Sequence, residues 1–437
     1  MPNTLLTPTQ ITREALRVLH NNLVFVKGLN RQYNSEFAKQ GAKIGSTVNI
    51  RKPNRYFVRK GSAMQTQGTS ETYVPLTLNN QWGTDISFSS TELTLSLDDF
   101  SKRILTPAMA KIASQIDQDC LQAAITGSMV GAGGNLVSCG SPVFNIVGTA
   151  GTTPGTGGGS ATGLQQYNAP ICYLNAGMQM DNNAAPRDEN RRIVLSPAAM
   201  AQSVSGLSGL FNDAGAIAEQ YRKGVLGQAL GFEFAMDQNV YTYASGSSAL
   251  ADWGNVTLTN AVSTATLAGN TTTITPGTIF TRAGCLAVNP ENQQSTGQLQ
   301  QFVVTANSRT TDGSYDLAVP ADRVVNIFPT PVLAGTGIAN GTVSAIPVAG
   351  AIVIVSQSAV STSYQQSLAY HQDAFTLATA DLEMPSGVDF ASRETYDGIS
   401  MRIVRAFDIT NDQFPCRIDV LGGFANIRSE LACRITG

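Results

Sequence analysis

The sequence predicts a mixed α+β protein with a long β-hairpin near its start and an all-β segment inserted late in the chain. Apolar residues have helical spacing near the N-terminus and again over residues 98 to 126. Alternating apolar residues between 46 and 90 predict two extended strands. Residues 245 to 362 contain short Val, Ile, Thr and Phe runs between Gly, Asn and Pro turns, which predicts a self-contained β-barrel or sandwich.

The composition favours large polar interfaces. The chain has 437 residues, enough for about two to four domains. Hydrophobic residues make up 42% and charged residues only 14% of the chain, against roughly 25% charged in an ordinary globular protein. Gly, Thr, Ser, Asn and Gln supply the remaining polarity, and they suit turn-rich structure and contacts between subunits.

Charge is distributed unevenly along the chain. The formal net charge is −3, yet residues 1 to 97 hold 11 basic residues against 5 acidic ones, and residues 98 to 437 hold 17 against 26. The run "IRKPNRYFVRKG" at 50 to 61 concentrates five cations, namely Arg51, Lys52, Arg55, Arg59 and Lys60. This asymmetry predicts that the basic N-terminal part lies on the acidic body of a neighbouring copy.

The N-terminal hundred residues predict a helix followed by a hairpin. Residues 9 to 20 have helical spacing and form a short amphipathic arm. The hairpin carries apolar residues on one side of each strand, and Pro53 and Pro75 mark its strands as edge strands. A two-stranded hairpin is not stable alone in water, so it must lie on something else. The alternating apolar residues are Val48 and Ile50 on the way out, and Val74, Leu76 and Leu78 on the return.

A long amphipathic helix is predicted over 98 to 126, with Ser96 as its cap. Pro107 should kink this helix or restart it with Thr106 as a new cap. Its expected buried face consists of Phe100, Ile104, Ala108, Ile112, Ile116 and Cys120. Residues 127 to 163 are predicted to be loose, and a second helix is expected to bury Leu164, Tyr167, Ile171, Leu174 and Met178.

The central and C-terminal segments alternate between strands and helices. "RRIVLSPAAM" predicts a buried strand that ends at a Ser196 cap, with Pro197 in the first helical position. A helix is expected through 219 to 223, followed by a Gly turn and strand in "VLGQALGFEFAMDQNVY". The tail predicts strands in "SLAYHQDAFTLAT", "ISMRIVRAFD", "CRIDVLGG" and "ELACRI".

No residue pattern indicates catalysis, a cofactor or a metal. A nucleophilic triad needs a base, and the only histidines are His20 and His371, for which structural or surface roles are expected. The six cysteines include no C-x-x-C pair, so reduced thiols are expected rather than a zinc or redox site. The glycine-rich stretch 148 to 163 matches neither phosphate-binding fingerprint. The sequence therefore predicts that the protein is not an enzyme.

The order of these segments resembles the major capsid protein of tailed double-stranded DNA bacteriophages, of the short-tailed-phage type with an inserted β-barrel. "RRIVLSPAAM" is similar to the family's strand that ends in Ser-Pro before a helix, and "VLGQALGFEFAMDQNV" resembles its Leu-Gly-aromatic turn and strand. "CRIDVLGGFANIRSELACRI" is similar to its closing stretch. The resemblance covers nearly the whole chain.

The resemblance implies a division of the chain into named parts. Residues 1–35 would be an N-terminal arm, 36–95 an extended loop, and 96–189 a peripheral domain built on a spine helix. An axial domain would comprise 190–244 and 398–437, an inserted β-barrel 245–362, and a peripheral return strand 363–397. The five cations at 51 to 60 would then contact a neighbouring subunit.

The resemblance also implies partners and a location. Pentamers and hexamers of the chain would form an icosahedral shell around packaged double-stranded DNA, in a virion assembled in the host bacterial cytoplasm. A separate scaffolding protein is expected because the chain begins almost directly with the arm, and a portal protein is implied as well. A decoration protein is left open. Some members of the family join subunits through a Lys–Asn bond, for which Lys60 is a candidate only by position, so no crosslink is expected. No membrane is expected either, because no apolar run approaches roughly 20 residues.

Three alternatives stay open at this point. The run at 50 to 61 could bind nucleic acid directly, because its cations flank Tyr56 and Phe57. The same fold could enclose an enzyme cargo as a cellular nanocompartment. Another virion component, such as a tail or spike protein, is the third reading, and the helix-rich body disfavours it.

Overall fold

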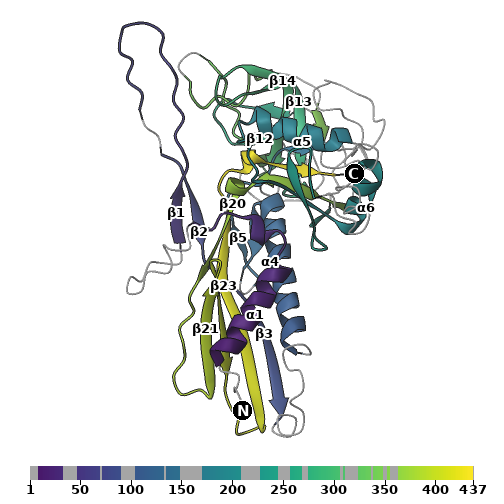
Figure 1. Cartoon of the computed structure of the whole chain (residues 1–437). Helices are drawn as coiled ribbons and strands as arrows, with labels where there is room; N and C mark the ends of the chain where they lie inside the picture. Colours follow the sequence, from purple (N-terminus) through teal and green to yellow (C-terminus); the bar gives the residue numbers. More distant parts are fainter. Residues whose placement is uncertain are drawn as a thin grey trace.

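The structure, a computed structural model, has three parts, which we call the elongated domain, the head and the inserted β unit (Figure 1). Helices and several sheets both contribute, so the predicted α+β class is confirmed. The residues that the structure describes are 8–32, 47–68, 71–89, 104–131, 134–147, 170–207, 227–244, 256–267, 274–305, 309–310, 323–335, 338–347, 352–354 and 363–436.

The elongated domain consists of a long antiparallel sheet with two helices along it (Figure 1). The strand order is β20-β23-β22-β21, and β3 pairs with the other edge of β23. The strands are β3 (Asn80–Ser89), β20 (Phe375–Ala380), β21 (Phe390–Tyr396), β22 (Ile399–Arg405) and β23 (Gln413–Asn426). The helices are α1 (Pro8–Asn22), which packs against α4 and β21, and α4 (Thr106–Thr126).

Helix α4 is the predicted long helix. It buries Ala108, Ile112, Ile116 and Cys120, as the helical spacing predicts, and it ends at Gly127, whose φ of 74° is the left-handed conformation that favours glycine at a helix end. Pro107 lies in the first turn of α4, and residues 104–105 directly before this helix are π-helical, so the chain is already helical where Pro107 enters. The expected Thr106 cap is wrong, because the residue before the helix proper is Leu105 and no side chain caps it.

The head contains a six-stranded sheet of order β6-β24-β19-β7-β9-β8 and the helices α5 and α6. Ser196 caps α6 as predicted, because its Oγ accepts the N–H of Ala199 at 3.3 Å. The strands are β6 (Ile146–Val147), β7 (Arg191–Leu195), β8 (Gln228–Ala229), β9 (Phe232–Met236), β19 (Ser367–His371) and β24 (Ala432–Ile435). The helices are α5 (Pro170–Asn182) and α6 (Pro197–Leu207).

The inserted β unit leaves and rejoins the head at one point. Strands β10 (Thr242–Ala244) and β18 (Ser363–Gln365) pair antiparallel and form its stalk. Beyond the stalk, an antiparallel sheet of order β11-β12-β16-β14-β13-β17, with β15 beside β16, has a hydrophobic core of its own. The strands are β11 (Val256–Leu258), β12 (Thr264–Leu267), β13 (Ile279–Val288), β14 (Ser295–Val304), β15 (Arg309–Thr310), β16 (Arg323–Phe328) and β17 (Ile352–Ile354). Among the residues described, the end strands β11 and β17 do not pair, so the sheet is not seen to close into a barrel.

The expected extent of the hairpin is wrong at its C-terminal end. The hairpin consists of β1 (Thr47–Arg51) and β2 (Tyr73–Thr77) only. The chain then turns away, and β3 pairs along ten residues of β23 in the elongated domain. Continuous pairing with a long central strand satisfies the backbone groups of β3 better than a free edge would.

The expected division of the C-terminal part is also wrong. The predicted single strand at 367 to 379 is broken by the 3-10 turn η4 (Gln372–Ala374), where the Asp373 N–H donates to Nδ1 of His371 at 3.2 Å. Strand β19 therefore joins the head, while β20 joins the elongated domain. Residues 398–437, expected in one domain, are divided in the same way, because β22 and β23 lie in the elongated domain and β24 in the head.

Two further predictions need correction. Helix α5 buries Cys172, Tyr173 and Met180, while Ile171 and Leu174 of the predicted buried face are exposed. The segment 127 to 163 was expected to be loose, yet it contributes β4 (Ser128–Val130), β5 (Leu136–Ser138) and β6. The predicted helix at 219 to 223, the predicted helical residues 98–103, 164 and 167, and the glycine-rich loop at 148 to 163 lie outside the described residues. Among the described helices, none is long and apolar enough to cross a bilayer.

Candidate functional site

The hairpin base is held on the body by its own alternating apolar residues. Ile50 lies opposite Val74, and Val48 lies opposite Leu76. Ile50, Val74 and Leu76 are buried against Ala378, Ala425 and Ile427 of the body. Burying such a side chain stabilises a fold by about 1.5–3 kcal/mol, so three of them fix the base firmly.

Beyond this base, the chain continues as a loop over residues 52 to 68 that projects alone beside the head (Figure 1). We call it the projecting loop. Val58 is 91% exposed and Met64 82% exposed, and Tyr56 is exposed as well. The loop contains four cations and no acidic residue. Its two sides are joined by Gln67, whose amide accepts the N–H of Phe57 at 3.0 Å and donates to its carbonyl at 2.6 Å.

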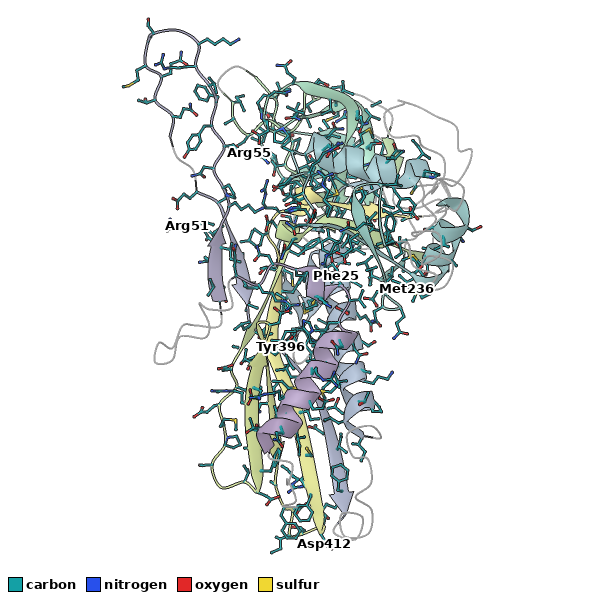
Figure 2. All side chains as sticks on the ribbon, in the orientation of Figure 1. Phe25, Arg51, Arg55, Met236, Tyr396 and Asp412 are labelled. Atoms are coloured by element: carbon teal, nitrogen blue, oxygen red, sulfur yellow. The ribbon has the colours of Figure 1, made fainter. Side chains whose placement is uncertain are left out.

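The five predicted contact residues lie along this segment and do not converge on one another. Arg51 pairs with Glu71 across the hairpin at 3.0 Å, and Arg55 reaches Glu430 of the body at 3.8 Å. Figure 2 shows Arg51 at the outer side of the hairpin and Arg55 on the side that faces the head. The Arg59 guanidinium donates to the carbonyl of Gly61, and Lys60 is exposed. Lys52 is half-buried at the root of the loop.

Two residues that sequence reasoning missed complete the root of the projecting loop. Oε1 of Glu430 lies 3.4 Å from Nε of Arg428 and 3.8 Å from the guanidinium of Arg55. Arg428 and Glu430 both lie in the stretch between β23 and β24, far from the loop in sequence. The pattern "IRSE" carries a basic and an acidic residue two positions apart, but nothing in it indicates the loop as its partner.

The opposite end of the molecule is an exposed turn between β22 and β23 that sequence reasoning also missed. Ile409 is 85% exposed and Phe407 is exposed on one side, with its ring 4.9 Å from the ring of Phe414. Asp408 accepts the N–H of Thr410 at 2.9 Å, which shapes the turn. Figure 2 shows Asp412 of the same turn at the far end of the elongated domain. The sequence feature that could have indicated this exposed turn is the pair Phe407 and Ile409 within the otherwise polar stretch "AFDITND".

A buried carboxylate holds the N-terminal segment against the body. Asp117 of α4 is 1% exposed, and its two oxygens accept the N–H groups of Val24 at 2.8 Å and Val26 at 3.0 Å. Burial, and then the nearby Asp237, raise the pKa of Asp117 to about 7, against the lowering effect of these backbone N–H groups. This carboxylate therefore joins α1 to the long helix.

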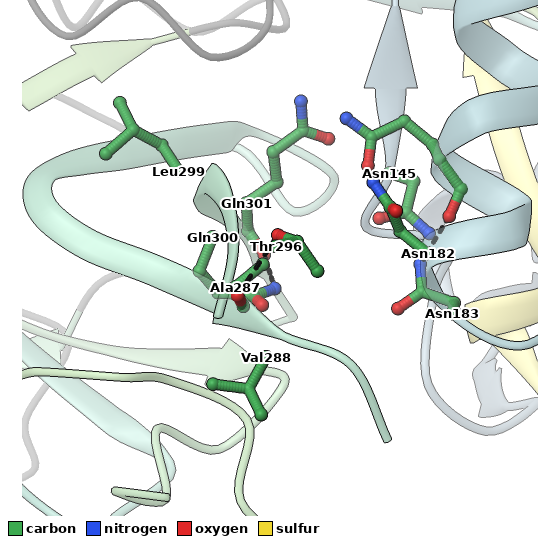
Figure 3. Close-up of a pocket in the computed structure, with 10 residues that line it drawn as sticks. Asn145, Asn182, Asn183, Ala287, Val288, Thr296, Leu299, Gln300 and Gln301 are labelled. Carbon is green, nitrogen blue, oxygen red and sulfur yellow. Dashed lines mark hydrogen bonds between the residues drawn. The ribbon is translucent and has the colours of Figure 1, made fainter. Parts of the chain in front are cut away.

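Amide side chains join the inserted β unit to the head. Figure 3 shows Gln300 and Gln301 of β14 facing Asn145, Asn182 and Asn183 of the head across a shallow cavity. The cavity is small, with a volume of about 10 Å³, close to the space that one water molecule needs. Its lining contains no charged residue, which gives it no group for acid–base work.

The two histidines have structural partners. Nε2 of His371 lies 3.0 Å from Asp188, and Nε2 of His20 lies 2.8 Å from Asp397, which also receives Arg31. All six cysteines are buried free thiols, and burial raises the pKa of Cys285 to about 11. Among the described residues, no three His, Cys, Asp or Glu side chains are grouped so as to hold a metal ion.

No protein-family model and no curated protein matches the sequence. A solved structure from Mycobacterium phage Che8 is similar at 12% identity and a TM-score of 0.42, over 94% of this chain and 90% of that chain. The capsid of Ralstonia phage GP4 is similar at 10% identity and a TM-score of 0.43, over 94% and 86%. A virus-like particle from Pyrococcus furiosus is similar at 7% identity and a TM-score of 0.37, over 98% and 97%.

These identities and TM-scores are low, so function is inferred from the surfaces of this chain itself.

Proposed function

We propose that this protein is the major shell subunit of a tailed bacteriophage, and that many copies assemble into a closed icosahedral container for double-stranded DNA. The observation that carries the proposal is the projecting loop. It extends from a well-anchored base, exposes Val58 and Met64, and carries four cations without an acid. An isolated chain gains nothing from such a loop, whereas a neighbouring copy can cover it.

The charge distribution supplies the second support. The loop is basic, while residues 98 to 437 carry nine more acidic than basic residues. The loop of one copy would contact a different surface on the next copy, which is a heterologous contact. Repeated heterologous contacts form a closed assembly when the rotation from copy to copy returns to the first copy. Arg51, Lys52, Arg55, Arg59 and Lys60 are the residues that we assign to this contact.

The same proposal includes the partners and the location of the protein. Pentamers and hexamers would form the shell, a separate scaffolding protein would guide assembly, and a portal protein would admit the DNA. The subunit would be made in the bacterial cytoplasm and end in the virion capsid, without cofactor or catalytic activity. A nanocompartment shell differs only in its content, so nucleic acid rather than enzyme inside isolated particles would separate the two.

The experiment reverses charge at the end of the loop, away from its anchored base. The double variant Arg59→Glu with Lys60→Glu should retain the unfolding temperature of the isolated subunit, because both residues are exposed. Sedimentation should show a large loss of assembled particles relative to the wild type. An unchanged particle yield would count against the proposal. Salt-dependent DNA binding that is lost in Arg55→Gln with Arg59→Gln, while assembly persists, would favour a nucleic-acid role for the loop.

A further inference from the structure

The root of the projecting loop holds more positive charge than its own surroundings neutralise. Lys52 and Arg55 come from the loop, and Arg428 comes from the body after β23. Glu430 is the one acidic residue among the described residues that is paired with this group, and both guanidinium groups approach the same oxygen, Oε1. Two guanidinium groups therefore share one carboxylate while Lys52 adds a further cation beside them, which leaves two positive charges in excess.

Lys52 has the most restricted environment of the three. It is half-buried, and its backbone N–H donates to the carbonyl of Thr72 at 2.8 Å, which fixes its position at the end of the hairpin. Within the described part of the chain, its ammonium group has neither a hydrogen bond nor an ion pair. Burial first of all lowers the pKa of Lys52, with Arg55 and Arg428 acting in the same direction and Glu430 in the opposite one.

Arg55 and Arg428 have guanidinium N–H donors that Glu430 does not use. A guanidinium carries five N–H donors in a planar fork. Arg428 uses Nε on Glu430 at 3.4 Å, whereas Arg55 lies 3.8 Å from the same oxygen. Their side chains are about one-third exposed, 36% for Arg55 and 29% for Arg428, so a small solute can reach them. Two guanidinium groups and an ammonium group are the donors that recognise a multiply charged oxyanion.

We propose that Lys52, Arg55 and Arg428 form a binding site for a phosphate-class oxyanion at the root of the projecting loop. The ligand supplies the negative charge that Glu430 alone does not, and it bridges the loop to the body because its three partners come from both sides. Free phosphate and a phosphodiester of nucleic acid share this chemistry. The site is a property of the single subunit and does not depend on shell assembly.

Calorimetric titration of inorganic phosphate into the purified full chain, at constant ionic strength in chloride, tests the site. One saturable site per chain is expected. Lys52→Gln and Arg428→Gln should each weaken binding about tenfold, because each removes a charged hydrogen bond. Lys111→Gln, at an exposed lysine on α4, should leave binding unchanged. Glu430→Gln should strengthen binding severalfold by removing the competing carboxylate, a gain that misfolding cannot produce.

A parallel titration with a short oligonucleotide identifies the source of the oxyanion. Binding of the oligonucleotide that Lys52→Gln and Arg428→Gln weaken assigns the site to a phosphodiester, and binding of inorganic phosphate alone assigns it to free phosphate. Absence of saturable binding of either probe would overturn the proposal. So would an affinity that Lys52→Gln and Arg428→Gln leave unchanged, or one that Glu430→Gln does not increase.

Discussion

The side-chain amide of Gln301 pairs with both backbone groups of Ile146, accepting the N–H at 2.6 Å and donating to the carbonyl at 2.9 Å. Ile146 lies in β6, the end strand of the head sheet, whose other side pairs with β24. A side chain from the inserted β unit therefore takes the place of a further strand at this edge. Because Gln301 occupies this edge of β6, the edge is also prevented from pairing with a strand of another chain.

Replacing Gln301 by Ala should lower the free energy of unfolding by about 2 kcal/mol, because it leaves two buried backbone groups without partners. Gln298→Ala is the matched control on the same strand. Its amide donates to Met178 and accepts from Gln179 in a more exposed position, so a smaller loss is expected. Urea unfolding of both variants measures the difference. Equal losses would show that the edge is not specifically held by Gln301.

Asp117 should make stability depend on pH. Its pKa is about 7 in the folded protein, against 3.8 as its ordinary value, so the folded state binds the proton more tightly. The stability from this proton is complete below about pH 4 and is lost as pH rises through 7. Between about pH 4 and pH 7, the free energy of unfolding should fall by up to about 1.4 kcal/mol per pH unit, and above pH 7 this dependence should level off.

The variant Asp117→Asn has no proton to lose, so its free energy of unfolding should change less between pH 6 and 8 than that of the wild type. Every other side chain is the same in the two proteins, so the difference in slope isolates Asp117. Asp85→Asn, at an exposed carboxylate, should keep the wild-type slope. Chemical denaturation at several pH values measures these slopes. A wild-type slope retained in Asp117→Asn would rule out this role.

Gly28 lies tightly against the body, with no room for a side chain. A Cβ at this position would lie 2.6 Å from the hydroxyl of Tyr370 and 2.7 Å from a guanidinium nitrogen of Arg192. Gly28→Ala should therefore destabilise the protein by about 1–3 kcal/mol through overpacking. Gly68→Ala is the control, since no atom lies within 4 Å of its added methyl group. Thermal unfolding compares the two, and equal unfolding temperatures would contradict this packing.

Local signals in the sequence predicted the elements that local interactions determine. The Ser196 cap before Pro197, the buried face of α4 and the alternation in β1 and β2 each depend on residues within a few positions of one another. Helix α5 shows the limit of such signals. Its sequence carries two apolar stripes, and the one with Tyr173 faces the core because of the elements that pack there, while Leu174 is exposed.

Long-range pairing was beyond sequence reasoning. β23 pairs with β3, β22 and β20 in turn, and no local pattern indicates which strand is opposite. The candidate site shows the same limit. The five cations of the loop were identified from their spacing, but Arg428 and Glu430 became part of the site only because the fold brings them to its root. Buried polar groups such as Asp117 likewise depend on distant backbone partners.

Electron microscopy of particles assembled from the purified chain, alone or with the scaffolding protein that we propose, tests the central claim most directly. The account predicts closed shells of uniform size in which the projecting loop of each subunit lies on a neighbouring copy, with Val58 and Met64 covered. Protein that stays monomeric under all assembly conditions, or shells in which residues 52 to 68 touch no other copy, would contradict it.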